Sequence, residues 1–308
     1  MDGVPIRGRD LAALILAAVC WGMGTVVSKA ALAGIPPATL LTIQLASSLV
    51  VLIILMRRQG IPLRGGAPPL LGRLGLLNPG VAYALGLVGL LTITASVSVL
   101  LWALEPLMIL LLAAAVLRER ITPAIVGWSV VAVAGIVLVV YDPTTIGGQL
   151  VGVALTVAGI TCCAAYTVIT RRLLPGASET SQVVLSQQAH ALVLAVVLSA
   201  VLAVLGGSVA PTAPTTASVV SAVLSGVLYY AGAYWLYLGA LRRVPASVAA
   251  SSFYLIPIVG VAGGWLLLGE RLGVAQWIGV ALVLVSVIVI LTRSSSVAAP
   301  MAVRASEG

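Results

Sequence analysis

One acidic residue lies deep inside a long apolar stretch of the sequence, where a charge is costly. Glu105 comes about ten residues into such a stretch and directly precedes Pro106. A charge at the centre of a bilayer costs about 2.5 to 3.5 kcal/mol on insertion scales, so an intramembrane acid is a functional candidate by default. Glu105 is predicted to bind an ammonium group or to carry a proton. The competing interpretation is a protonated acid, bonded to backbone that the proline leaves without its helical partner.

A single histidine is the other deep group that titrates near neutral pH. His190 lies in an apolar stretch beside Gln187 and Gln188, which form a polar step with it. We interpret His190 as a candidate for coupling or gating. The alternative, that it is a packing residue whose ring nitrogens are satisfied locally, stays open.

Aromatic residues make up 5% of the chain and only one of them is Phe, so clusters of rings are informative. At about 100° per residue, Tyr230, Tyr234 and Tyr237 fall on one face of a helix. These rings are expected to line a binding cavity, because binding pockets are mostly apolar with a few polar groups. Tyr237 also suits an interfacial aromatic belt. The other deep rings assigned to the cavity are Tyr83, Trp102, Tyr166, Phe253 and Tyr254.

The composition requires that lipid surrounds these residues. Of 308 residues, 61% are hydrophobic and 8% are charged, with a mean hydropathy of +1.20. Soluble domains carry about a quarter charged residues, so most soluble folds are excluded. The three cysteines show no CxxC spacing and are interpreted as buried small residues. No metal cluster, P-loop or hydrolase motif is present in the sequence, so we expect neither an enzyme nor a cofactor or metal.

Ten stretches have the roughly 20 apolar residues that a membrane-spanning helix needs. Long unbroken runs exclude a barrel of alternating strands. The fold class expected is therefore an all-α integral membrane protein with ten transmembrane helices. The predicted spans are Leu11–Leu32, Ala38–Met56, Leu70–Leu91, Ala95–Leu117, Ala124–Tyr141, Val151–Thr170, Val183–Leu205, Ala217–Leu238, Ser247–Leu268 and Val274–Thr292.

The cations separate by side. With a cytoplasmic N-terminus, 14 of the 16 Lys and Arg residues fall on cytoplasmic segments, and Lys29 and Arg271 fall outside. This is a strong positive-inside signal. It accounts for the net charge of +8 without a nucleic-acid partner and predicts that both termini are cytoplasmic. The first apolar run is too long for a secretory signal peptide.

An internal repeat divides the chain. The pattern that begins at Ala95-Ser96 and includes Pro106 recurs 151 residues later at Ala246-Ser247 and Pro257. Five spans per half is an odd number, so the two copies enter the membrane in opposite orientations. The predicted organisation is a five-helix repeat over residues 1–145 and an inverted one over 146–308. The two prolines are expected to mark flexing elements.

The repeat also pairs charged residues at the two mouths. Glu119 corresponds to Glu270, and a weaker match pairs Lys29 with Arg171. We predict ion-pair latches, Lys29 with Glu270 outside and Arg171 with Glu119 inside, made and broken during transport. The alternative is that both acids simply end their helices beside neighbouring arginines.

These motifs resemble a known family. The 5+5 arrangement, the Ala-Ser…Pro…Glu-Arg pattern and the Cys20-Trp21-Gly22 entry to the first span are similar to the EamA-type branch of the drug/metabolite transporter superfamily. Within it the chain most resembles YddG-type exporters of aromatic and other amino acids. The resemblance implies a monomeric secondary transporter of the inner membrane that exports small amphipathic metabolites by alternating access. A drug or toxic-metabolite exporter of the same superfamily is the alternative.

Overall fold

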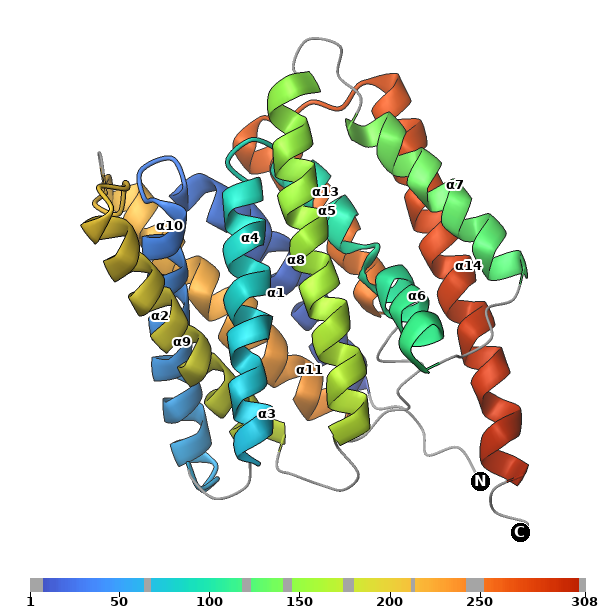
Figure 1. Cartoon of the computed structure of the whole chain (residues 1–308), viewed down its shortest axis with the longest axis horizontal. Coiled ribbons are helices and arrows are strands. Elements are labelled where there is room, and N and C mark those ends of the chain that lie inside the picture. Colours follow the sequence, from blue (N-terminus) through green and yellow to red (C-terminus); the bar gives the residue numbers. More distant parts are fainter. Residues whose placement is uncertain are drawn as a thin grey trace.

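The computed structural model describes residues 8–63, 68–117, 123–140, 146–173, 180–211, 214–241 and 252–304, and within them it is all helical, without a strand. The helices run roughly alongside one another as a bundle (Figure 1). Inner and outer below denote the ends of this bundle that are predicted to face the cytoplasm and the outside. Four unbroken helices are α1 (Gly8–Ala31), α2 (Pro37–Arg58), α8 (Ile146–Leu173) and α9 (Thr180–Val204).

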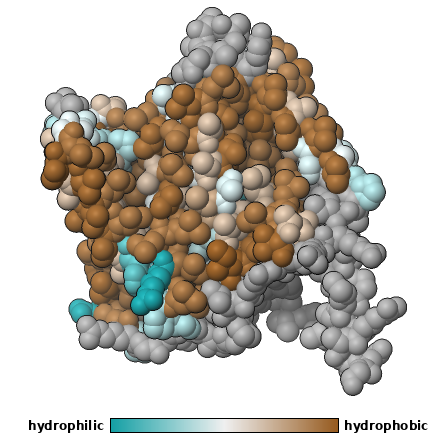
Figure 2. All heavy atoms as spheres, viewed as in Figure 1, coloured by the Kyte–Doolittle hydropathy of each residue, from teal (hydrophilic) through white to brown (hydrophobic). Residues whose placement is uncertain are grey.

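Every predicted span has a helical counterpart among the described residues. Seven stretches are long and apolar enough to cross a membrane, and three shorter apolar helices, Val126–Val140, Ser252–Leu268 and Val274–Val289, complete the ten. Apolar side chains cover most of the face seen in Figure 2, as lipid contact requires. The last helix, α14, covers Val274–Arg304 and so continues past the end of its predicted span at Thr292. Polar residues can continue a helix beyond the bilayer because its backbone bonds are internal.

The third and eighth spans are composite helices. The third is kinked within Leu77–Val81, where Asn78 has non-helical backbone angles (φ −139°, ψ 117°), and the eighth contains a π-helical segment at Val227–Gly232. A π turn bonds residue i to i+5 and is often found at functional sites. The flanking helices are α3 (Pro69–Arg73) and α4 (Ala82–Gly89) in the third span, and α10 (Thr216–Gly226) and α11 (Ala233–Leu241) in the eighth.

The fourth span is interrupted just before its proline, and the described part of the ninth begins with a 3-10 turn just before Pro257. In the fourth, Ala103 and Leu104 form a turn between two helices. Pro106 has no N–H to donate to the Trp102 carbonyl, so a continuous helix would lose this bond, whereas the first turn of a new helix does not need it. Pro257 has the same place. The helices concerned are α5 (Ala95–Trp102), α6 (Glu105–Leu117) and α13 (Leu255–Leu268), the last preceded by a 3-10 turn at Ser252–Tyr254.

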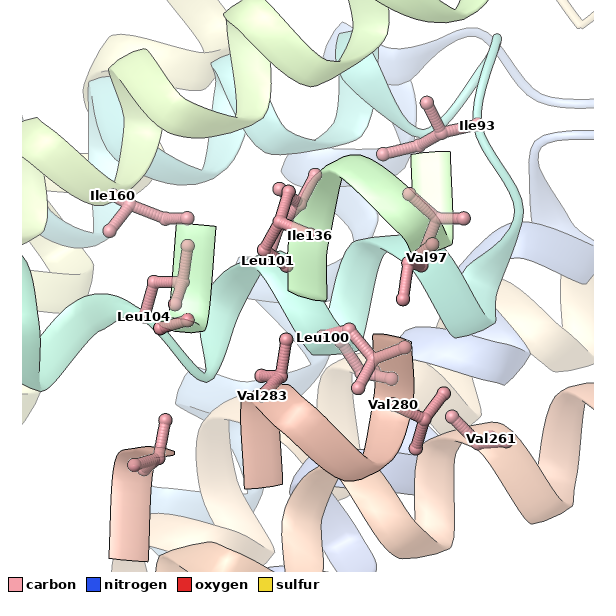
Figure 3. Close-up of a cluster of buried hydrophobic side chains, with 14 of the residues drawn as sticks. Ile93, Val97, Leu100, Leu101, Leu104, Ile136, Ile160, Val261, Val280 and Val283 are labelled. Atoms are coloured by element: carbon pink, nitrogen blue, oxygen red, sulfur yellow. The ribbon is translucent and has the colours of Figure 1, made fainter. Parts of the chain in front are cut away.

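A core of aliphatic side chains surrounds α5. Leu100 and Leu101 are fully buried and point toward side chains of neighbouring helices, among them Val283 (Figure 3). On one side of the bundle, α7 (Pro123–Val140) packs along α14 (Figure 1). Their backbones approach closely at Gly135, where a Cβ atom would lie 2.9 Å from the Gly279 carbonyl oxygen. Small residues permit such close helix packing in membranes.

Candidate functional site

Four aromatic rings meet inside the bundle, where α4, α5 and the π-helical segment of the eighth span come together. The rings of Tyr83 and Trp102 are stacked, with centroids 5.2 Å apart and planes inclined by 13°. Tyr229 and Tyr230 each contact Tyr83 edge-on at 5.3 Å. Stacked and edge-on arrangements are the favourable geometries for aromatic pairs. We call these four rings the outer ring cluster.

A second set of four rings lies toward the inner end and centres on α1. Trp21 contacts Tyr234, Tyr237 and Phe253 edge-on, at centroid distances of 5.5, 5.6 and 5.4 Å. Tyr237 and Phe253 are in turn stacked at 5.0 Å. We call this set the inner ring cluster. Trp21 is its central residue, yet its sequence position indicated only a family motif. Its depth in the first apolar run was the signal that marks it as a cavity candidate.

The π-helical segment explains why the eighth span contributes rings to both clusters. The sequence predicted one ladder of Tyr230, Tyr234 and Tyr237, but Tyr230 joins the outer cluster while the other two contact Trp21. A π turn contains more residues than an α turn, so it shifts the angular register of everything that follows. It also brings Tyr229, which the sequence did not single out, into the outer cluster.

Glu105 lies between the two ring clusters. It interacts electrostatically with Tyr83 and Tyr229 of the outer cluster and with Tyr234 of the inner one. Its carboxyl group is also within hydrogen-bonding reach of the Cys163 thiol, on α8. Cys163 is 3% exposed. The fold thus surrounds one acidic group with phenol rings and a thiol, and it starts α6 at this acid, immediately after the break.

A small internal cavity adjoins the outer ring cluster. Its volume is about 30 Å³, which accommodates water-sized molecules only. Besides rings, three hydroxyl-bearing side chains line it: Thr25 and Ser28 on α1 and Ser98 on α5. An amphipathic solute therefore needs the rings and helices to move apart before it can enter. The full lining is Thr25, Ser28, Tyr83, Gly86, Leu87, Leu90, Ser98, Trp102, Tyr229 and Tyr230.

Three other predicted site residues lie outside the ring contacts. The Tyr166 hydroxyl donates to Gln187 Oε1 at 3.1 Å, and Tyr166 interacts electrostatically with Tyr234. His190 Nδ1 lies 2.8 Å from the Ser186 carbonyl oxygen of its own helix. Tyr254 packs against the aliphatic core around α5. Tyr166 therefore borders the site, whereas His190 and Tyr254 pack at other places.

A buried polar network fixes the helices behind the rings. Gln44 Nε2 donates to the hydroxyls of Ser28 and Ser225, both at 2.8 Å. In a second chain of bonds, the Ser48 hydroxyl donates to Gln188 Oε1 at 2.6 Å, and Gln188 Nε2 donates to the Tyr230 carbonyl at 2.9 Å. The second chain ends in the π-helical segment, where helical bonding is irregular. Gln188 thus supports the backbone that carries the outer ring cluster.

The two charged residues at the outer mouth bind backbone groups in and beside one connection between helices. Lys29 donates to the carbonyl oxygens of Leu90 and Ile93, at 2.6 and 2.9 Å. Glu270 accepts from the backbone N–H groups of Ala95 and Ser96, at 2.7 and 2.9 Å. Glu270 is near enough to act electrostatically on Lys29, but Lys29 bonds the connection between α4 and α5, Glu270 bonds the first residues of α5, and the two side chains do not bond each other. The direct Lys29–Glu270 latch is therefore not formed in this structure.

The inner latch falls outside what the structure describes. Glu119 lies in residues 118–122, and for Arg171 only the helical backbone is described. Their pairing stays a prediction.

Comparison with known proteins identifies the family of the chain. The EamA-like transporter family matches the chain twice, over residues 10–141 and 150–292. The protein belongs to the EamA-like transporter family. The expectation of a membrane transporter of the drug/metabolite superfamily is thereby confirmed, and the narrower resemblance to YddG-type exporters stays a prediction. Membership also favours transport over catalysis as the activity.

Relatives extend over most of the chain. An uncharacterized transporter of Archaeoglobus fulgidus is 25% identical over 285 residues, which cover 91% of this chain and 98% of that protein. The permease-like protein YdzE of Bacillus subtilis is 36% identical over 66 residues, 21% of this chain and 85% of that protein. A solved crystal structure with 20% identity shares the fold at a TM-score of 0.59, covering 91% of this chain and 96% of its own.

Proposed function

We propose that this EamA-family protein exports small amphipathic metabolites, above all amino acids including aromatic ones. The observation that carries the proposal is the position of Glu105 between two clusters of aromatic rings. An aromatic amino acid combines a flat ring with an ammonium group. The rings offer stacking and edge-on contacts to the first, and the carboxylate offers a charge-assisted bond to the second.

The hydroxyl groups of the cavity complete the proposed site. Thr25, Ser28 and Ser98 line the cavity beside the rings. The Thr25 and Ser28 hydroxyls donate to the Trp21 and Gly24 carbonyls of their own helix, so the Ser98 hydroxyl remains to donate a hydrogen bond to a substrate carboxylate. Because the present cavity of about 30 Å³ is too small for any amino acid, binding requires the halves of the bundle to separate. The stacked rings of Tyr83 and Trp102 would then receive the substrate ring.

Alternating access between two inverted five-helix repeats is the mechanism we propose. Support comes from the family match, which covers each half separately. Further support comes from the kink at Asn78 in the third span, the π-helical segment in the eighth, the break before Pro106 in the fourth and the 3-10 turn before Pro257 in the ninth. Interrupted helices lie at the binding sites of many secondary transporters. The breaks would act as the flexing elements, with both termini on the cytoplasmic side.

Export of cationic drugs or toxic metabolites is the second candidate. The lack of cations in the described lining of the cavity, which contains no Lys or Arg, favours this candidate. A cation with an aromatic ring needs only the carboxylate and the rings, whereas an amino acid must also satisfy its own carboxylate. The two candidates differ in this one requirement, so a panel of solutes separates them.

Counterflow into liposomes containing the purified protein tests the proposal. We expect saturable exchange of tryptophan, phenylalanine or methionine. Glu105→Gln keeps the side-chain size but removes the charge, and it should lower exchange by about tenfold or more, since bonds to charged groups contribute about 1.5 to 3 kcal/mol. Glu307→Gln, in the C-terminal tail, is the matched control. Absence of amino-acid exchange together with exchange of a cationic drug would transfer the assignment to the second candidate.

Proton coupling is tested in the same vesicles. If Glu105 or His190 carries a proton, an imposed pH gradient drives uptake, and collapsing the gradient stops it. Transport that is unchanged by the collapse identifies a facilitator.

A further inference from the structure

Two charged residues hold opposite ends of one short connection at the outer mouth. The connection, residues 90–94, joins the end of α4 to the start of α5. Lys29 binds the carbonyl oxygen of Leu90 at the end of α4, where a helix leaves carbonyls without partners, and that of Ile93 farther along the connection. Glu270 binds N–H groups at the start of α5, where a helix leaves donors without partners. Each charge has the sign that the helix dipole favours at its end.

The Glu270 carboxylate is built into the start of α5. It accepts from the N–H groups of Ala95 and Ser96 and from the Ser96 hydroxyl at 2.5 Å. The next donor, Val97 N–H, is taken by the Thr94 hydroxyl at 3.1 Å. The first turn of α5 is thus satisfied jointly by its own cap and by a residue from the other half of the chain.

A glycine makes room for this contact. A Cβ atom on Gly264 would lie 2.5 Å from Glu270 Oε2 and 2.7 Å from Ser96 Oγ. The chain turns back toward α5 through Gly269, whose φ of +67° lies in the left-handed region, and Glu270 N–H bonds the Gly264 carbonyl at 3.1 Å. The end of α13 is therefore shaped to present Glu270 to α5.

The connection covers the outer side of the small cavity. Leu90, whose carbonyl Lys29 binds, lines that cavity, and so does Ser98, one turn into α5. Ser98 is 2% exposed, whereas Leu91 in the connection is 48% exposed. The connection thus lies between this cavity and the outer surface.

We propose that Glu270 and Lys29 are the closing contacts of an outer gate, in which Glu270 is a helix cap that is released when the mouth opens. Both side chains are themselves half-buried, and their bonds to the backbone are only partly buried, so water can reach the two charged groups once the bonds are lost. The buried Gln44 and Gln188 bonds lack such access, so they act as permanent supports. The inference rests on the proposed transport function. In place of the predicted direct Lys29–Glu270 ion pair, it has Lys29 bind the connection between α4 and α5 and Glu270 bind the start of α5.

Labelling of a cysteine at Ser98 tests the gate without any substrate. In a protein whose native cysteines are replaced by alanine, Ser98→Cys should react slowly with a membrane-impermeant thiol reagent added from outside. Glu270→Gln and Gly264→Ala should each speed labelling by about tenfold or more, because loss of one charge-assisted bond shifts an equilibrium by that factor. Lys29→Gln should act in the same direction. Gly264→Ala is informative because it leaves every charge in place.

Matched controls separate gating from general damage. Arg271→Gln removes a neighbouring charge that lies 5.2 Å from the centre of the Trp265 ring, and it should change Ser98→Cys labelling less than about twofold, since exposed charges contribute little. Ser208→Cys, at an exposed position, should label at one rate in every background. Unchanged melting temperatures show that the variants fold.

Equal labelling rates in the parent, Glu270→Gln and Gly264→Ala would overturn the gate. Faster labelling without any amino-acid exchange would leave the gate standing and reject the substrate assignment instead. The two proposals can therefore fail separately.

Discussion

Replacement of Trp21 tests whether the inner ring cluster holds the bundle together. Trp21 is 8% exposed and contacts three rings edge-on, those of Tyr234, Tyr237 and Phe253. Each aromatic pair contributes about 0.5 to 1.5 kcal/mol beyond the area it buries. Trp21→Leu removes all three pairs while keeping an apolar side chain, so the cost is about 1.5 to 4.5 kcal/mol if the pairs are additive.

Thermal unfolding of the purified protein in detergent measures this cost. About 1 kcal/mol corresponds to roughly 2 to 4 °C for domains of 150 to 250 residues, so we expect the apparent melting temperature of Trp21→Leu to fall by about 3 to 18 °C. Trp21→Phe preserves a ring and should lose about half as much or less. Trp277→Leu is the matched control, because Trp277 is 52% exposed on the lipid-facing side of α14.

The reasoning is refuted if Trp21→Leu lowers the melting temperature no more than Trp277→Leu does. That result would mean that the edge-on contacts contribute nothing beyond ordinary apolar packing. A large loss of stability in Trp21→Phe would also contradict the argument, since the ring contacts would then not be its cause.

Two further substitutions probe the outer ring cluster. A Cβ atom on Gly24 would lie 2.7 Å from the Tyr229 ring, so Gly24→Ala should displace that ring, destabilise the protein by about 1 to 3 kcal/mol and impair exchange. Gly127→Ala, with nothing within 4 Å of its Cβ, should do neither, and equal melting temperatures for the two variants would contradict this. Gln188→Leu breaks the bonds to Ser48 and to the π-helical segment. At about 0.6 kcal/mol per membrane hydrogen bond, it should lower the free energy of unfolding by about 1 kcal/mol. Ser48→Ala should lower it by about half as much, and thermal unfolding measures both.

Much of the fold was predictable because lipid acts on each stretch of sequence independently. A spanning helix satisfies its own backbone, so about 20 apolar residues suffice to predict it. The breaks before Pro106 and Pro257 follow from the missing N–H of proline. The kink of the span beginning at Pro69 lies at Asn78-Pro79-Gly80, residues that interrupt helices. The π-helical segment of the span beginning at Thr216 was not predicted, since no local signal in Val227–Gly232 distinguishes a π turn from an α turn.

The candidate site was predictable only in part. Glu105 and the deep rings stood out because polar and aromatic residues are scarce in this chain. Trp21 and Tyr229 were missed, because their importance depends on which faces of distant helices meet. Tyr237 fitted an interfacial belt by its position near the end of the eighth span, yet it stacks on Phe253 inside the bundle.

The sequence alone thus determined that lipid surrounds the protein, how many helices span it and which acid lies deep within them. Each of these depends on the character of residues close together in the chain. The tertiary structure decided which side chains and backbone groups contact each other. It divided the tyrosines of the eighth span between two ring clusters, and it directed Lys29 and Glu270 to backbone groups in and beside one connection. Complementary charges along a sequence indicate only that two residues attract each other. Whether they meet depends on unpaired backbone groups at nearby helix ends, which compete for the same charges and are placed by packing.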